Sequence, residues 1–180
     1  MNPINKHLSK FISLVLRHQP EVIQLELDAK GWADVEELIT KMKAKGKKID
    51  RALLEEIVLT NDKQRFTFNA TKDKIRANQG HSIAVDLEFE AERPPEILYH
   101  GTSEKSIKSI LQTGLEKRSR QHVHLSADLE TATKVGQRHG KVVILKVQAG
   151  KMNELGFAFY LSKNGVWLTN EVPVEYLELM

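Results

Sequence analysis

The chain has 180 residues, of which 41% are hydrophobic and 28% are charged. This composition is typical of a folded globular protein and excludes the low hydrophobicity and high charge of a disordered chain. The 27 Lys and Arg residues against 24 Asp and Glu leave a net charge of +3, too small to indicate nucleic-acid binding by itself. The sequence contains no cysteine, which excludes disulfides, thiolate nucleophiles and cysteine-ligated zinc.

The only apolar run near the N-terminus, Phe11 to Leu16, is shorter than a signal-peptide core. It is followed by Arg17-His18-Gln19-Pro20 instead of a small-residue cleavage site. No segment approaches the roughly 20 apolar residues that a membrane-spanning helix needs. We therefore expect a cytoplasmic protein with no membrane partner. A monomer is the default, because no association stripe is evident.

The first part of the chain predicts three short helices followed by a β-hairpin. The first helix ends before Pro20, and Asp34 and Asp50 are the expected N-caps of the other two. Alternating apolar residues then predict the hairpin, with strands at 66–68 and 75–77. The apolar face of the first helix consists of Ile4, Leu8, Phe11, Ile12 and Val15. This order of elements is that of a winged helix, a helix-turn-helix variant that lies against nucleic acid.

A further alternating strand is predicted from Ile83 to Phe89, after which the paired prolines Pro94 and Pro95 prevent a continued helix or ladder. We place the domain boundary at these prolines. The prediction is a winged-helix-like, RNA-binding lobe over residues 1–92 and a second lobe over residues 97–180.

The second lobe predicts an α+β fold with mixed strands and helices. Asn164-Gly165 is the strongest hairpin signal in the chain. Strands are expected at 97–99, 123–125, 142–147, 157–161, 166–169 and 172–177, and helices at 103–112 and 126–137.

The common phosphate-binding and metal-binding motifs are missing. The sequence has no Gly-rich loop ending in Lys-Ser/Thr, no Gly-x-Gly-x-x-Gly turn and no His-Glu-x-x-His. His122 and His124 form only a His-x-His pair, so no metal site is expected.

Four basic residues stand at the ends of predicted elements or on solvent faces: Arg17, His18, Arg76 and Arg138. Taken singly, each is an ordinary solvated charge. If the two lobes face each other, these residues converge on a cleft where guanidinium groups can grip a phosphate bidentately.

Five segments in order carry a family resemblance: Leu8 to Pro20, Gly31-Trp-Ala-Asp34, Ile75 to Ser82, Leu98-Tyr-His-Gly-Thr102 and His122-Val-His-Leu-Ser126. With them the chain resembles the NAD-dependent RNA 2′-phosphotransferases that act on the 2′-phosphates of tRNA splice junctions. The resemblance implies that the essential Arg-His-Arg-Arg set falls on Arg17, His18, Arg76 and Arg138. Arg118 and Arg120 compete for the fourth place.

The resemblance also implies an ADP-ribosyltransferase-like second lobe, with NAD⁺ as co-substrate and no metal. The implied NAD⁺-binding residues are Tyr99, His100, Gly101, Thr102, His124 and Ser126. Many ADP-ribosyltransferases place a glutamate on a later strand, but here Glu171 does not clearly align with it and stays outside the catalytic set.

The family's reaction has two steps. The RNA 2′-phosphate displaces nicotinamide from NAD⁺, and the RNA-2′-phospho-ADP-ribose intermediate then gives 2′-OH RNA and ADP-ribose 1″,2″-cyclic phosphate. A phosphate dianion needs no general base, and fixed arginines can take the place of a metal as the charges build up.

RNA contacts are expected from the predicted hairpin, at Lys72, Lys74, Asn78, Gln79 and His81. A basic run nearby is either a second RNA surface or a solvated face: Lys41, Lys43, Lys45, Lys47, Lys48 and Arg51. Trp32 and Trp167 are expected in the core more than as base-stacking platforms.

Two other functions stay open. One is an ADP-ribosyltransferase that stops after the first step and leaves ADP-ribose on a nucleic-acid phosphate or a protein. The other is a winged-helix regulator whose second lobe senses a ligand and releases no nicotinamide.

Overall fold

The computed structural model describes residues 3–180, and the side chains of all of them other than residues 3, 4 and 139. The chain forms two compact units that divide between Glu88 and Phe89. Each unit has its own hydrophobic core. The division precedes the predicted boundary because the next residues pair with the second unit: Ala91 bridges Tyr160, and the N–H of Glu92 donates to the carbonyl of Phe159 at 2.8 Å.

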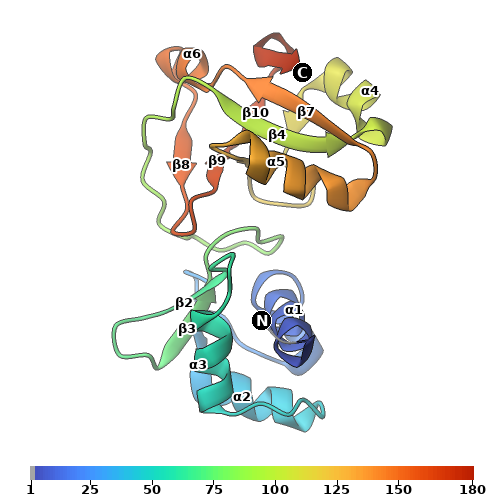
Figure 1. Cartoon of the computed structure of the whole chain (residues 1–180). Helices are drawn as coiled ribbons and strands as arrows, with labels where there is room; N and C mark the ends of the chain where they lie inside the picture. Colours follow the sequence, from blue (N-terminus) through green and yellow to red (C-terminus); the bar gives the residue numbers. More distant parts are fainter. Residues whose placement is uncertain (1–2) are drawn as a thin grey trace. The chain divides into compact units, whose positions relative to one another are not determined.

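The first unit contains the three predicted helices and the predicted hairpin (Figure 1). Both predicted N-caps are confirmed, since the carboxylates of Asp34 and Asp50 accept from the backbone N–H groups of Glu37 and Leu53 at 2.8 Å. Its elements are α1 (Pro3–Arg17), η1 (Pro20–Ile23), β1 (Ala33–Asp34), α2 (Val35–Ala44), α3 (Arg51–Leu59), β2 (Phe66–Phe68) and β3 (Lys74–Ala77).

The hairpin pairs in the predicted register, with Phe66 opposite Ala77 and Phe68 opposite Ile75. The short strand β1, which the sequence did not reveal, adds to the other edge of β3 in the order β1-β3-β2. On the predicted face of α1, Leu8, Ile12 and Val15 are buried and Phe11 packs against the core. The side chain of Ile4 lies outside the described residues.

The predicted strand from Ile83 to Phe89 is wrong, because this segment joins no ladder. Asp86 donates one backbone hydrogen bond to the carbonyl of Ala29, and Glu88 has a positive φ of 57°. Leu87 is buried. The alternating pattern of residues 83–89 therefore arises because one side of an extended segment packs on the unit. This segment does not pair with a neighbouring strand.

The second unit has small antiparallel sheets and flanking helices, in agreement with the predicted α+β class. Its elements are β4 (Leu98–Ser103), α4 (Glu104–Thr113), β5 (Leu115–Glu116), β6 (Val123–Leu125), α5 (Leu129–Gly136), η2 (Gln137–His139), β7 (Val142–Val147), α6 (Ala149–Glu154), β8 (Phe159–Leu161), β9 (Trp167–Thr169), β10 (Glu171–Val172), η3 (Val174–Tyr176) and β11 (Leu177–Leu179). The sequence did not reveal β5 or α6. The predicted strand at 172–177 is wrong as one element, because Pro173 ends β10 and η3 follows.

Two three-stranded sheets, β11-β7-β4 and β6-β9-β8, position the candidate site of this unit. They are linked where Tyr99 of β4 forms an isolated bridge with Ser126, just after β6. Helix α5 packs across β4, as Figure 1 shows. No helix within residues 3–180 has the length and the apolar run needed to cross a membrane.

Candidate functional site

In the first unit, the end of α1 places Arg17 beside Arg65, which immediately precedes β2. The Nη2 group of Arg17 donates to the carbonyl oxygen of Arg65 at 3.4 Å. Both arginines are half-buried, whereas His18 is exposed. The Nη1 group of Arg65 donates to Asn61 Oδ1 at 3.0 Å. Burial lowers the pKa of Arg65, and the Asp62 carboxylate opposes the shift. Arg17 is therefore tied to the main chain of Arg65, and both side chains are partly desolvated.

The centre of this basic region is His81, whose side chain is fully buried. Burial, together with the positive charges of Arg17, His18 and Arg76, lowers its pKa to about 4. Neither ring nitrogen has a hydrogen-bond partner among the described residues. His81 is therefore a neutral ring with basic side chains around it. We call Arg17, His18, Arg65 and Arg76 the basic cluster.

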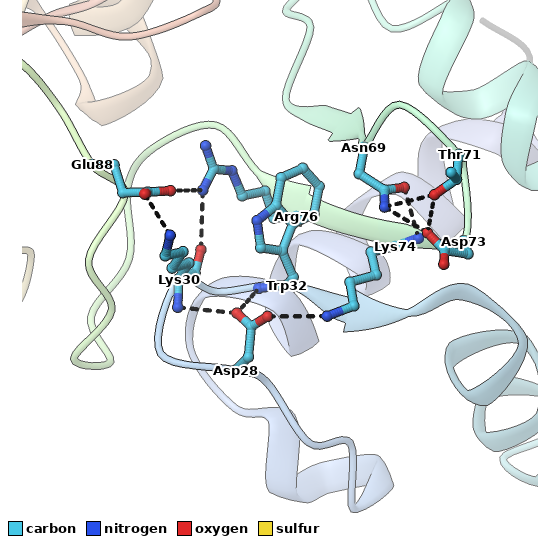
Figure 2. Close-up of polar contacts among 9 residues, drawn as sticks. All are labelled: Asp28, Lys30, Trp32, Asn69, Thr71, Asp73, Lys74, Arg76 and Glu88. Carbon is cyan, nitrogen blue, oxygen red and sulfur yellow. Dashed lines mark hydrogen bonds and ion pairs between the residues drawn. The ribbon is translucent and has the colours of Figure 1, made fainter.

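Arg76 of the basic cluster makes several contacts within its own unit (Figure 2). Its guanidinium carbon lies 4.5 Å from the centre of the Trp32 ring. Its Nη1 group donates to the carbonyl of Lys30 at 3.3 Å and lies 3.8 Å from the Glu88 carboxylate. The predicted phosphate contact of Arg76 therefore competes with a structural role, in which Arg76 stacks on Trp32.

The predicted RNA-binding residues of the hairpin differ in their exposure. Asn78 and His81 are buried, and Gln79 is half-buried. The amide of Asn78 donates to the carbonyl of Gln64 at 2.5 Å, so this side chain holds the segment before β2. Asn78 and His81 thus line the interior of the unit, although the sequence pattern indicated surface contacts.

The two hairpin lysines are exposed. Lys72 lies in the turn between β2 and β3 with a φ of 58°. The ammonium group of Lys74 lies 3.4 Å from the carboxylate of Asp28 (Figure 2). Both can reach a ligand in solvent, although Lys74 has to leave this ion pair.

The basic run surrounds a shallow depression of about 590 Å³ between α2 and α3. Its lining residues are Lys43, Gly46, Lys47, Lys48, Ile49, Asp50 and Leu53. Elsewhere in the run, Lys41 pairs with Glu37, and Arg51 pairs with two glutamates. Lys43 and Lys48 have no ion pair within residues 3–180. The depression therefore combines an apolar floor with available positive charge.

In the second unit, the predicted NAD⁺-binding residues gather where the two sheets meet. Tyr99 and Ser126 exchange backbone hydrogen bonds of 2.9 and 2.8 Å. His100 Nδ1 lies 3.1 Å from the carbonyl oxygen of His124, so Nδ1 carries the proton and donates. Arg120 Nη1 lies 3.5 Å from His124 Nδ1. We call Tyr99, His100, His124, Ser126 and Arg120 the sheet junction.

Gly101 and Thr102 belong to the same predicted motif but are buried. A Cβ atom on Gly101 would lie 1.8 Å from the carbonyl oxygen of Ala132 in α5, which no side chain can tolerate. Gly136 of α5 also faces this strand, since a Cβ atom there would lie 3.0 Å from the carbonyl carbon of Gly101. The glycine in this motif therefore has a packing function: it lets α5 approach β4.

The three candidates for the fourth basic position lie in different places. Arg138 is exposed in η2, and Arg118 is exposed in a turn with a φ of 51°. Arg120 is also exposed, and its Nη1 group lies 3.5 Å from Nδ1 of His124, a predicted NAD⁺-binding residue. Glu171 pairs in register with Glu116 between β10 and β5. In the described part of the chain, no three His, Asp or Glu side chains are grouped as metal ligands would be.

Two residues that the sequence did not single out complete the first-unit site, Arg65 and Ser82. Arg65 precedes the hairpin in a charged stretch and carries no local pattern that separates it from a surface arginine. Ser82 ends the Ile75 to Ser82 segment, and its hydroxyl lies 2.9 Å from His18 Nδ1. Only long-range contacts reveal either of them.

Comparison with known proteins gives one consistent family. The family model described as RNA 2′-phosphotransferase, Tpt1 / KptA family, matches residues 4–171. A probable RNA 2′-phosphotransferase of Flavobacterium johnsoniae is 58% identical over 97% of this chain and 96% of its own length. Those of Hahella chejuensis and Fusobacterium nucleatum are 55% and 53% identical, over 97% and 95% of this chain and 94% and 96% of their own lengths. With the five motif segments in place and nearly full-length matches, the chain belongs to the RNA 2′-phosphotransferase family.

Proposed function

We propose that this protein removes a 2′-phosphate from RNA by transferring it to NAD⁺. The observation that carries the proposal is the grouping of Arg17, Arg76 and His18 around the buried, neutral His81, with Arg65 joined to Arg17 through its backbone carbonyl. The relatives' names, probable RNA 2′-phosphotransferase, give the class of substrate. The three helices and hairpin of the first unit support a winged-helix-like RNA-binding lobe, and the sheets of the second support an ADP-ribosyltransferase-like lobe.

The basic cluster suits an RNA phosphate for electrostatic reasons. Guanidinium groups bind phosphate oxygens in pairs, and partial burial strengthens their attraction for a dianion. Arg65 is half-buried, and its pKa is lowered by that burial, which a bound phosphate would relieve. We assign the phosphate to Arg17, His18 and Arg65. Arg76 reinforces the positive field while it remains stacked on Trp32.

The sheet junction suits NAD⁺. This co-substrate presents ribose hydroxyls, a pyrophosphate, and a nicotinamide that leaves to expose an electrophilic ribose C1″. Half-buried Tyr99, His100, His124 and Ser126 offer an aromatic face and polar atoms, and Arg120 brings a positive charge beside His124. We therefore propose Arg120 as the fourth basic residue in preference to Arg138. In this proposal, Gly101 and Thr102 support the junction from the interior.

The proposed reaction has two steps. An oxygen of the RNA 2′-phosphate bonds to C1″ as the bond from C1″ to nicotinamide breaks, giving RNA-2′-phospho-ADP-ribose. The ribose 2″-OH next bonds to phosphorus and loses its proton, while the RNA 2′-oxygen leaves and takes up a proton. Fixed arginines stabilise the negative charge that builds on the phosphoryl oxygens in the second step.

The lysine depression between α2 and α3 is proposed as the surface that holds the RNA backbone. Lys43, Lys47 and Lys48 line it, and Ile49 and Leu53 supply an apolar floor. Contacts of lysines with phosphates are independent of RNA sequence and weaken with salt. Lys72 and Lys74 extend the positive surface along the hairpin.

The test is to incubate the purified protein with an RNA carrying one internal 2′-phosphate, with and without NAD⁺. We expect release of nicotinamide, 2′-OH RNA and ADP-ribose cyclic phosphate, only when NAD⁺ is present. ADP-ribosylated RNA that persists would instead identify a transferase that stops after the first step. If the phosphate stays on the RNA and nicotinamide is not released, the proposal is wrong.

A further inference from the structure

Ser82 makes two contacts with the end of α1, one through its backbone and one through its side chain. Its N–H donates to the carbonyl oxygen of Arg17 at 3.0 Å. Its hydroxyl oxygen lies 2.9 Å from Nδ1 of His18. The backbone N–H of His18 is meanwhile held by the carbonyl of Leu14 at 2.9 Å. The main chain and the ring of His18 are thus fixed by separate hydrogen bonds.

The position of Ser82 is itself well determined. The residue before it, His81, is fully buried and serves as an anchor for the segment after β3. Gly31 lies behind that anchor, since a Cβ atom there would be 3.6 Å from His81 Nε2. Ser82 is exposed, so its side chain points from a fixed backbone toward solvent and His18. A hydroxyl held in this way can restrict the rotation of the His18 ring.

A hydroxyl is a suitable partner for a histidine that changes its protonation state. In neutral His18, Nδ1 can accept a hydrogen bond from the serine O–H. In cationic His18, the Nδ1–H donates a hydrogen bond to the serine oxygen after the hydroxyl rotates. A backbone carbonyl could serve only the protonated nitrogen. The contact with Ser82 therefore survives both forms of the ring.

We propose that Ser82 is the positioning residue of His18, holding the imidazole in one orientation in its neutral and its cationic form. The inference rests on the proposed function, in which His18 contacts the RNA phosphate. Arg17, Arg65 and Arg76, the other members of the basic cluster, share this region with the neutral His81. A dianionic phosphate that binds there favours cationic His18. Ser82 allows that change without reorientation of the ring.

The experiment compares Ser82→Ala, which removes the hydroxyl, with Ser82→Thr, which keeps it. Ser13→Ala is the matched control, because Ser13 lies on α1 and its hydroxyl has no hydrogen-bond partner among the described residues. Turnover is measured with 2′-phosphorylated RNA and saturating NAD⁺, and thermal unfolding confirms that each variant is folded. We expect Ser82→Ala to lower kcat by about 10- to 100-fold with a smaller change in KM for RNA. Ser82→Thr should recover most of this loss, and Ser13→Ala should match the wild type.

A second measurement is independent of turnover. In protein labelled with ¹⁵N at histidine, the Nδ1 resonance of His18 should shift in Ser82→Ala and return in Ser82→Thr. Wild-type kcat in Ser82→Ala, or an unchanged Nδ1 resonance, would overturn the inference. Failure of Ser82→Thr to recover both would also overturn it. A wild-type protein that releases no phosphate refutes the proposed function, while the ¹⁵N resonances still test whether Ser82 orients His18.

Discussion

Gly101 of β4 lies directly under the carbonyl oxygen of Ala132 in α5, so close that a Cβ atom at position 101 would be 1.8 Å from that oxygen. We predict that Gly101→Ala lowers the free energy of unfolding by about 3 kcal/mol or more, because two backbone segments must separate. Denaturant unfolding measures the change. Gly46→Ala is the control: it has a φ of 73° but open space around it, and should cost about 1 kcal/mol. Equal stability of Gly101→Ala and wild type would contradict the packing role.

This relationship also bears on how the Tyr99-His-Gly-Thr102 segment is interpreted. The resemblance implies that Gly101 binds NAD⁺, whereas its contacts show why a side chain is excluded. If Gly101→Ala is inactive, the loss follows from displaced packing as readily as from a lost ligand contact. Variants of His100 and Ser126, which are half-buried at the sheet junction, are the better reporters of NAD⁺ binding.

Arg120 and Arg138 should differ sharply when each is replaced by alanine. Both side chains are exposed, but Arg120 lies beside His124, whereas Arg138 lies in η2. We expect Arg120→Ala to lower turnover by about 10²-fold, the effect of removing one donor of an electrostatic clamp. Arg138→Ala should remain within about threefold of the wild type, as for a solvated surface charge. Steady-state rates with 2′-phosphorylated RNA provide the comparison. The reverse order of effects would restore Arg138 as the fourth basic residue.

The limits of sequence-based inference are clear from particular residues. Asp34, Asp50 and Asn164-Gly165 act through contacts within a few residues, so their caps and turn could be predicted. Arg65 could not, because its place in the basic cluster depends on α1, which is 48 residues away in the chain. The segment 83–89 alternates like a strand, yet no neighbouring strand is available to pair with it. The local pattern of apolar residues cannot show whether a distant segment will pack against or pair with a given stretch of chain.

Arg76 should prove more important for stability than for chemistry. We predict that Arg76→Lys lowers the free energy of unfolding by about 1 to 2 kcal/mol, because lysine stacks less well on Trp32 and has no guanidinium group to keep the Nη1 hydrogen bond to the carbonyl of Lys30. Turnover should fall much less than in Arg65→Lys, which is expected to lose about 10²-fold. Denaturant unfolding and steady-state rates of both variants provide the test. A larger loss of turnover in Arg76→Lys would confirm the sequence-based assignment of Arg76 to the phosphate.

The buried His81 predicts a pH dependence of stability. Its pKa is about 4 in the folded protein against 6.5 for an ordinary histidine, so the unfolded chain binds this proton more readily. The contribution of neutral His81 to the free energy of unfolding is therefore fully present above pH 6.5 and decreases as the pH falls toward 4. By about pH 5 it should have decreased by about 2 kcal/mol. His81→Gln should lose this part of the pH dependence, whereas His7→Gln, an exposed position on α1, should keep it. Identical pH profiles for wild type and His81→Gln would show that His81 is not held neutral.

The lysine depression predicts a salt effect that can be assigned to named residues. Each lysine that contacts a phosphate contributes about one unit to the slope of log affinity against log salt concentration. We expect the double variant Lys43→Ala, Lys48→Ala to bind 2′-phosphorylated RNA more weakly and to lower that slope by about 1 to 2 units. Lys41→Ala is the control in the same basic run, because Lys41 already pairs with Glu37 and should affect the slope little. Binding curves at several salt concentrations measure both. An unchanged slope in the double variant would mean that the RNA backbone lies elsewhere. Turnover per bound RNA should stay the same in either case, because the variant leaves the basic cluster intact.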